Sequence, residues 1–422
     1  MTKAFVGSQE DTGWHSVKTF YEYESHGKKI IDATISDWYN CSYSYVTYRG
    51  GDDETKLTQD LVGETVDWYF DNHKDDSRTN YDEDGDGYID AVSIIYAAPD
   101  YNSHDYGKDP KTHEKYSNFW AYVYWIQDSK GSNKKDVNNP GANCFLWASY
   151  SFLNKDTSHC AIDTHAYIHE SGHLFGLEDY YDYAANSYSP AGGFSMQDYN
   201  VGGHDPYSLA TLGWTNNYIP TATTTYTISP FESSGDVIML INDYEDSVFD
   251  EYLLIELYSP TGTNKMDSDY KYAETVKGPT NTGIRLWHVD SRLIYKLSGQ
   301  AWTEANITNQ IYSGYSNTLL CTNNTYDSSQ ASYINYSPLA GRGNYNKYKL
   351  LQLIRNNDYF GTESGKNINN NALFYQGDSF TMNKYKLCFT ETGKLNSGRQ
   401  LKWSFTVDSL SSTSATITVN KL

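Results

Sequence analysis

The sequence contains no apolar run long enough to cross a membrane. Its longest apolar stretches, residues 91–98 and 120–126, have the length of strands, whereas a transmembrane helix needs about 20 apolar residues. Cysteine is scarce as well, and the five cysteines form no C-x-x-C pair, which excludes a disulfide scaffold and a cysteine zinc site. They are Cys41, Cys144, Cys160, Cys321 and Cys388. From the absence of a long apolar run we expect no membrane span.

Basic residues are also few. Lysine and arginine number 32 against 53 aspartates and glutamates, which gives a formal net charge of −21. Such a chain repels the phosphate backbone, so we expect no nucleic-acid partner. Aromatic residues make up 16% of the chain, with 41 tyrosines, which is enough for a real core and argues against disorder. At 422 residues the chain is too long for one ordinary domain.

The first half of the chain alternates between strand and helix patterns. β-Branched and aromatic runs predict strands, apolar residues at helical spacing predict helices, and a glycine ends the last helix. The predicted strands cover 28–39, the end of 81–98, 119–126 and 143–152, and the predicted helices cover 55–70 and 163–176. This order predicts a mixed sheet with helices packed on it, an α+β fold.

The sequence changes character after Trp214. Residues 215–228 are rich in threonine, and from there on short apolar strands alternate with turns, which is typical of a β-sandwich. The predicted strands cover 237–241, 252–257, 284–289, 401–407 and 414–419. We therefore predict a first domain of residues 1–218 and a β-rich C-terminal domain of residues 219–422.

A metal-binding pattern occupies the last predicted helix of the first half. Residues 169–179 read HESGHLFGLED, and histidines four residues apart lie on one helical face, one turn from each other. His169 and His173 are therefore predicted to bind one Zn²⁺ together. Glu170 lies beside them but off their line, so it is free to take a proton from the water on the metal.

The third ligand must come from beyond the helix. Glu178, Asp179 and Asp182 are all within reach of the turn that follows Gly176. The metzincin spacing H-E-x-x-H-x-x-G-x-x-D favours Asp179, which gives the three protein ligands usual in a catalytic zinc site. His165 lies one turn before the histidine pair, too far for all three histidines to share one ion, and we expect it to pack.

Three residues downstream are candidates for further roles. Met196 lies in GGFSMQDY, where a methionine turn beneath the metal would be the second metzincin feature. Tyr199 follows three residues later, where a phenol could donate to the oxyanion of a tetrahedral intermediate. An ordinary structural tyrosine is the other interpretation, and His204 is a weaker candidate for the same role.

A second metal pattern precedes the zinc helix in the sequence. Residues 82–90 read DEDGDGYID and match the first half of an EF-hand Ca²⁺ loop. Position 12 is Ser93 instead of glutamate, and a strand follows, so the match ends there. A solvated acidic turn is the alternative. The predicted oxygen ligands of a structural Ca²⁺ are the side chains of Asp82, Asp84, Asp86 and Asp90 and the carbonyl of Tyr88.

Together these segments resemble the immune inhibitor A family of secreted bacterial zinc metallopeptidases. The resemblance rests on HESGHLFGLEDYYDY and GGFSMQDYNVGGHDPYSLATLGW, and on YDEDGDGYIDAVSIIYA before them. The segments SVKTFYEYESHGKKIIDATISDWY, EYLLIEL, GIRLWHVD and ALFYQGDSF are also similar to the family, so that the similarity covers roughly residues 14–390.

The resemblance implies a metzincin-like catalytic domain, a mixed sheet with an active-site helix, followed by a β-sandwich-like domain. It implies zinc ligation by His169, His173 and Asp179, with Glu170 as the general base. It also implies a secreted or cell-surface enzyme that is made with a signal peptide and a pro-segment.

These patterns predict an extracellular zinc-dependent endopeptidase that hydrolyses peptide bonds in protein or peptide substrates. An extended substrate would bind along an edge strand above the zinc helix, and Glu170 would move the proton from water to the leaving amine. The alternative is a surface adhesion or carbohydrate-binding protein with a structural or degenerate zinc site. A zinc amidase or deacetylase with a small-molecule pocket is a third interpretation. The sequence does not indicate an oligomeric state.

Overall fold

The structure, a computed structural model, describes most of the 422-residue chain. The described residues are 1–41, 54–108, 116, 119–126, 133–181, 189–273, 276–296, 303–304, 316–319, 321, 324, 349–358, 367–389 and 392–422. They belong to two compact units: a first unit of Met1–Thr19 and Ile31–Leu177, and a second unit of Phe20–Ile30 and Glu178–Leu422. Each unit contains helices and strands, so the predicted α+β class is confirmed. Among the described residues, every helix is too short or too polar to span a bilayer.

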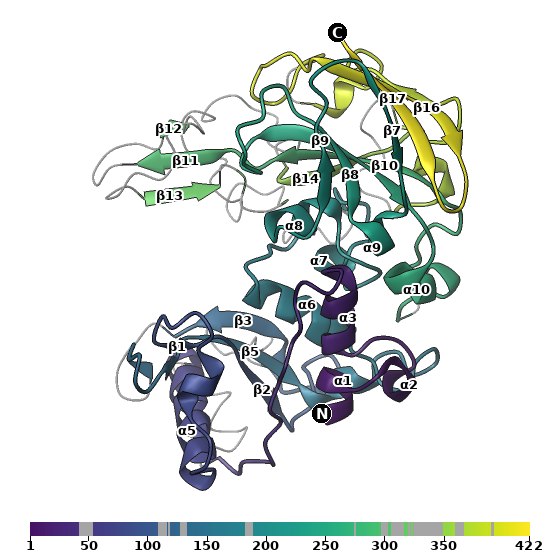
Figure 1. The fold of residues 1–422 in the computed structure, drawn as a ribbon. Helices are drawn as coiled ribbons and strands as arrows, with labels where there is room; N and C mark the ends of the chain where they lie inside the picture. The colour runs from purple at the N-terminus through teal and green to yellow at the C-terminus, as the bar shows by residue number, and fades with distance from the viewer. Residues whose placement is uncertain are drawn as a thin grey trace. The chain divides into compact units, whose positions relative to one another are not determined.

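A three-stranded mixed sheet forms the middle of the first unit (Figure 1). β5 (Cys144–Ser149) lies between β2 (Val92–Tyr96), to which it is parallel, and β3 (Tyr122–Trp125), to which it is antiparallel. β1 (Tyr88–Ile89) and β4 (Gly141–Ala142) form a separate parallel pair. The strands predicted after the acidic loop and in the next two apolar segments are confirmed.

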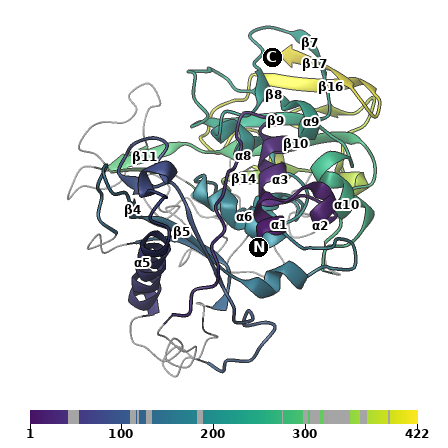
Figure 2. The ribbon, with the colours of Figure 1, turned by 60° about the horizontal axis from the view of Figure 1, so that its bottom comes forward.

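Helices cover this sheet. α5 (Glu54–Asn72) contributes Val62 to a core that it shares with Phe145 and Trp147 of β5, and Figures 1 and 2 show the helix beside the sheet. α6 (His165–Leu174) packs against β5 and β3. Almost all of β5 is buried, as expected of a strand covered on both faces. Both predicted helices of the first half are confirmed.

Shorter elements complete the first unit. They are α1 (Thr2–Val6), α2 (Gln9–Thr12) and the 3₁₀ turns η1 (Arg78–Tyr81) and η4 (Tyr150–Asn154). α3 (Val17–Glu24) begins in the first unit and ends in the second.

The predicted strand at 28–39 is wrong. Residues 29–41 are all described and contain no helix or strand. The side chains of Ile30 and Trp38 are 57% and 60% exposed. Alternating apolar residues favour extended backbone, but a strand also needs a neighbour to pair with. This segment instead connects the second unit back to the first.

Two larger sheets build the second unit. One has the strand order β14-β10-β9-β8-β6 and the other the order β15-β16-β17-β7. All strands predicted for the C-terminal half are among them. The strands are β6 (Asn216–Tyr218), β7 (Thr224–Ile228), β8 (Asp236–Leu240), β9 (Glu251–Tyr258), β10 (Gly283–Asp290), β14 (Leu351–Ile354), β15 (Ser379–Phe380), β16 (Trp403–Leu410) and β17 (Ala415–Lys421).

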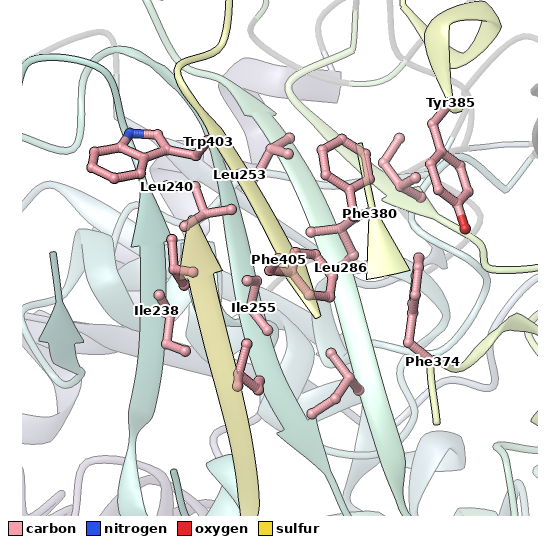
Figure 3. Close-up of a cluster of buried hydrophobic side chains, with 14 of the residues drawn as sticks. Ile238, Leu240, Leu253, Ile255, Leu286, Phe374, Phe380, Tyr385, Trp403 and Phe405 are labelled. Carbon is pink, nitrogen blue, oxygen red and sulfur yellow. The ribbon is translucent and has the colours of Figure 1, made fainter. Parts of the chain in front are cut away.

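The two sheets share one apolar core, which Figure 3 shows in close-up. Ile238, Leu253 and Leu286 of the larger sheet lie in the same buried cluster as Phe380 and Phe405 of the smaller one. The two phenylalanines are cross-strand partners, and their rings stack with centroids 5.8 Å apart. Two sheets that bury their inner faces against each other form a β-sandwich.

Short helices and a third sheet complete the second unit. The helices are α7 (Met196–Tyr199), α8 (Pro206–Thr211), α9 (Phe231–Ser234) and α10 (Lys265–Asp269), with the 3₁₀ turns η5 (Gly262–Asn264), η9 (Asn370–Ala372) and η10 (Lys386–Cys388). The third sheet has the order β12-β11-β13, formed by Thr303–Glu304, Leu293–Lys296 and Ser316–Leu319.

The compact units do not follow the predicted domain ranges 1–218 and 219–422. Residues 178–218 belong to the second unit. The physical reason is visible at β6, which lies before the predicted boundary but pairs in parallel with β8 of the larger sheet. The segment that follows α6 is therefore built into the β-rich unit.

Candidate metal centre

The C-terminal end of α6 is shaped by Gly176. This residue has φ = 86°, a left-handed conformation that favours glycine. Its N–H donates to the carbonyl of His173 at 3.0 Å, and the Leu177 N–H donates to the carbonyl of Gly172 at 3.1 Å. These two bonds form a Schellman cap. The cap ends the helix where the sequence predicted it and turns the chain toward Asp179.

Two imidazoles of α6 meet at their Nε2 atoms. The Nε2 atoms of His169 and His173 are 3.2 Å apart, and the ring planes are nearly perpendicular, at 87°. Two nitrogen ligands of a tetrahedral zinc, each at ~2.0–2.1 Å, lie about 3.3 Å from each other. The pair therefore has the spacing that a shared zinc ion requires. The same spacing also suits an N–H···N hydrogen bond, so the case for a metal depends on a third donor.

The orientation of His173 is fixed by its other ring nitrogen. His173 Nδ1 lies 2.7 Å from the carbonyl oxygen of Leu177. Because a carbonyl only accepts, this contact assigns the proton to Nδ1 and leaves the lone pair of Nε2 for a metal. The role of Leu177 was not predicted from the sequence. The available signal was the position of Leu177 directly after the predicted capping glycine. A cap of this kind folds the carbonyl of Leu177 back toward the last helical turn.

Asp179 supplies the third donor. One ligand atom each from His169, His173 and Asp179 lies within 4.8 Å of the other two. Asp179 is only 8% exposed, and its Oδ2 accepts a hydrogen bond of 3.0 Å from the Tyr181 hydroxyl. Glu178, an alternative ligand, is exposed, and Asp182, the other alternative, lies outside the described residues. Two neutral imidazoles and one carboxylate are a donor set that suits Zn²⁺.

The two other acid–base residues of α6 are buried. Glu170 is 6% exposed and follows His169 directly, and its role as general base stays a prediction. His165 is fully buried. Its Nδ1 lies 2.8 Å from an Asp163 oxygen, and its ring stacks on Trp14 with centroids 4.0 Å apart. His165 therefore packs in the core of the first unit.

Met196 begins a tight turn in the second unit. The residue is fully buried, and its N–H donates to the carbonyl of Gly203 at 3.1 Å. Asp198 closes the turn from the other side, since its Oδ2 accepts the Gly193 N–H at 2.7 Å. Met196 therefore lies buried at the start of the short helix α7. Its placement beneath a metal stays a prediction, because the histidines belong to the first unit.

The two candidates for an oxyanion donor differ in their surroundings. Tyr199 is half-buried at the end of α7, and its proposed contact with a substrate stays a prediction. His204 is 1% exposed and packs against the rings of Phe20 and Tyr21, with centroids 5.4 and 5.6 Å away. Its Nδ1 lies 3.6 Å from a Glu24 oxygen. This packing gives His204 a structural role.

The acidic loop at 82–90 brings three of its predicted ligands together. One carboxylate oxygen each from Asp82, Asp84 and Asp86 lies within 4.8 Å of the other two. Gly87 has φ = 89°, which only glycine adopts readily. Hard oxygen donors at this spacing fit Ca²⁺, although exposed carboxylates also gather without an ion.

Backbone amides order the same loop. The Asp86 N–H donates to Asp82 Oδ1 at 3.0 Å, and the Tyr88 N–H donates to Asp86 Oδ1 at 2.8 Å. Asp90 accepts from the Glu83 N–H at 3.3 Å through its Oδ2. The Asp90 side chain and the Tyr88 carbonyl stay predicted ligands.

Comparison of the chain with protein-family models gives no match, and neither does comparison with curated proteins. The resemblance to the immune inhibitor A family therefore stays a prediction. The case for a function depends on the chemistry of the residues themselves.

Proposed function

We propose that the chain is a zinc-dependent endopeptidase of the metzincin type. The observation that carries the proposal is the 3.2 Å separation of the Nε2 atoms of His169 and His173, with an Asp179 oxygen within 4.8 Å. Glu170, the next residue after His169 in α6, is buried. Three protein donors leave a zinc ion with an open position, which is the usual arrangement in hydrolytic sites.

The chemistry divides between the metal and the side chains. Zinc, when bound, supplies Lewis-acid chemistry that polarises a carbonyl and makes water acidic enough to attack near neutral pH. The Glu170 carboxylate accepts the proton of the attacking water and then gives it to the nitrogen of the leaving amine. The Leu177 carbonyl accepts from His173 Nδ1, which orients the ring and selects the tautomer whose Nε2 lone pair can bind a metal. Tyr199 is proposed as the hydroxyl donor to the oxyanion.

The edge of the first unit's sheet suits an extended peptide. Within the described residues, β3 pairs with β5 alone and so has one open edge. α6 packs against β3, and Figure 1 shows the two elements close together. A peptide added as a further strand would therefore run past the helix that carries the histidines. This edge supports a polypeptide substrate over the small amide of an amidase or deacetylase.

Calcium and location complete the proposal. We propose that Ca²⁺ binds the carboxylates of Asp82, Asp84 and Asp86 and plays a structural role, since it neutralises crowded charges where the loop enters β1. We also propose a secreted or cell-surface peptidase related to immune inhibitor A, on the sequence resemblance alone.

Replacement of Glu170 by glutamine tests the proposed function. Glu170→Gln keeps the shape of the side chain but removes the base, so casein hydrolysis should fall by about 10²–10⁴-fold while the bound zinc stays equal to that of the wild type. Glu10→Gln, the same change at an exposed residue of α2, is the control and should leave both unchanged. Casein hydrolysis by Glu170→Gln at the normal rate would overturn the assignment, and a wild-type chain that binds no zinc would overturn the proposal as a whole.

A further inference from the structure

β14 leaves backbone groups at the edge of the larger sheet. Within the described residues it pairs with β10 alone. In an antiparallel pair, alternate residues bond to the neighbour and the others point away from it. Leu351 and Leu353 point away, and the Leu353 N–H donates to the carbonyl of Pro190 at 2.9 Å. The N–H and the carbonyl of Leu351 also point away from β10, and both bond to a side chain from another part of the sequence.

That side chain is the carboxamide of Asn324. Its Oδ1 accepts the Leu351 N–H at 3.0 Å, and its Nδ2 donates to the Leu351 carbonyl at 2.7 Å. The second N–H of the same nitrogen donates to the carbonyl of Tyr180 at 2.8 Å. Asn324 is fully buried, so its carboxamide acts like the peptide group of one more strand. It ties Tyr180 to the sheet across 144 positions of sequence.

Tyr180 is held at every polar group. Its N–H donates to the carbonyl of Gln197 at 2.8 Å, its carbonyl accepts from Asn324, and its hydroxyl lies 2.9 Å from the hydroxyl of Ser208. The side chain is 1% exposed. Because Asp179 is the residue directly before Tyr180, these bonds fix the backbone from which the Asp179 carboxylate projects.

The anchor of Asn324 is itself fixed. Its backbone carbonyl accepts from Lys349 Nζ at 2.9 Å, and this lysine is fully buried. Asn324 and Tyr180 are therefore both held in place by hydrogen bonds. We propose that Asn324 is a positioning residue for the third metal ligand: it holds Tyr180 on β14 so that Asp179 faces the metal. The inference rests on the proposed zinc site and extends it to a residue of the β-rich unit.

Zinc affinity of the full chain tests the inference. Asn324→Ala should weaken zinc binding 10- to 100-fold in a chelator competition, as is typical when a partner behind a ligand is lost. The absorption spectrum of the Co²⁺-substituted variant should differ from that of the wild type. A double-mutant cycle shows whether the effect passes through the ligand. In an Asp179→Ala background, Asn324→Ala should change zinc affinity less than twofold.

A matched control separates positioning from general loss of stability. Asn356 is a half-buried carboxamide of the second unit that, like Asn324, bonds to a backbone carbonyl. Its Nδ2 donates to the Leu373 carbonyl at 3.3 Å and to Asp378 Oδ2 at 2.8 Å. Asn356→Ala should lower stability with zinc affinity unchanged. If Asn324→Ala fails to fold, Asn324→Asp keeps the size of the side chain and the acceptor for Leu351 while it removes the donor to Tyr180. It should also bind zinc more weakly.

Three results would count against the inference, and they differ in which of the proposals they overturn. Folded Asn324 variants that bind zinc as tightly as the wild type would overturn the positioning role and leave the proposed function intact. An equal loss of zinc affinity in Asn356→Ala would also overturn it, since the effect would then be one of stability. If Asp179→Ala binds zinc as tightly as the wild type, the assignment of Asp179 as the third ligand is overturned, and the inference is overturned with it.

Discussion

Asp198 is a carboxylic acid in surroundings that disfavour its charge. The residue is 2% exposed. Its Oδ2 accepts the Gly193 N–H, whereas its Oδ1 finds no hydrogen-bond partner within the described residues. Burial is the largest cause that raises the pKa of Asp198, and the carboxylates of Asp205 and Asp179 also raise it. The Gly193 hydrogen bond and the Arg355 cation lower it, and the resulting pKa is about 7. The neutral acid is therefore the form that the fold prefers.

The consequence is a loss of stability as the pH rises. The unfolded chain ionises Asp198 from pH 3.8 upward, but the folded chain holds the proton until about pH 7, so the stabilising effect present at low pH is lost in this range. Between pH 5 and pH 8 the loss is about 3 kcal/mol. Asp198→Asn mimics the neutral acid, so it should gain stability relative to the wild type as the pH rises from 5 to 8. Urea unfolding of the metal-free proteins measures this. A constant difference between the two at both pH values would contradict it.

Single residues of the candidate site differ in how far the sequence reveals them. His169, Glu170 and His173 follow from helical spacing, because residues one turn apart on a helix must be neighbours. Asp179 follows from the capping glycine, and the structure brings it to the histidines. Asn324 could not be predicted: its contact with Tyr180 spans 144 positions and depends on the path of an edge strand, for which a single sequence carries no pattern.

Among the elements, the acidic loop before β1 offers a test that is independent of the zinc site. If Ca²⁺ binds Asp82, Asp84 and Asp86, it stabilises the folded chain by RT ln(1 + [Ca²⁺]/Kd), about 2.7 kcal/mol at a hundredfold excess over Kd. Thermal unfolding with Ca²⁺ and with a chelator should therefore show a higher melting temperature for the calcium-loaded wild type.

The Asp84→Asn variant should lose most of this difference, because one carboxylate ligand becomes a weaker neutral donor. Asp75→Asn, at an exposed aspartate outside the loop, should keep it. A melting temperature of the wild type that is the same with Ca²⁺ and with the chelator would refute the calcium proposal and leave the zinc site untouched.

The elements that the sequence predicted correctly are those that carry their own burial signal. β8, β9 and β10 are buried at every residue. Apolar residues predominate in each of them, which suffices to find these strands, although β9 and β10 also contain buried charged residues. Residues 28–39 have an alternating apolar pattern, which also favours a strand, but they contain none. Whether an extended segment pairs is decided by what lies beside it in the folded chain, and local sequence does not contain that information.

At the scale of the whole molecule, the segment after α6 is held by residues that lie much later in the sequence. Gly202 N–H donates to Asp267 Oδ2 at 2.7 Å, and Gly203 N–H donates to Asn264 Oδ1 at 2.9 Å. An Arg285 guanidinium N–H donates to the Phe194 carbonyl at 3.3 Å. These partners all lie beyond residue 218, so a chain cut at the predicted domain boundary would leave buried groups of residues 178–218 without them.

A fragment of residues 1–218 therefore should not be an independent catalytic domain. Unpaired buried donors and acceptors cost about 1–3 kcal/mol each, which is a large part of the stability of any domain. We expect protease digestion of the isolated fragment to cut within residues 178–218, and zinc affinity to fall because Asp179 loses its anchor. Addition of residues 219–422 as a separate chain should restore protection and zinc binding together. If the fragment alone resists digestion and binds zinc like the full chain, the β-rich half is an appendage and the histidine pair needs nothing from it.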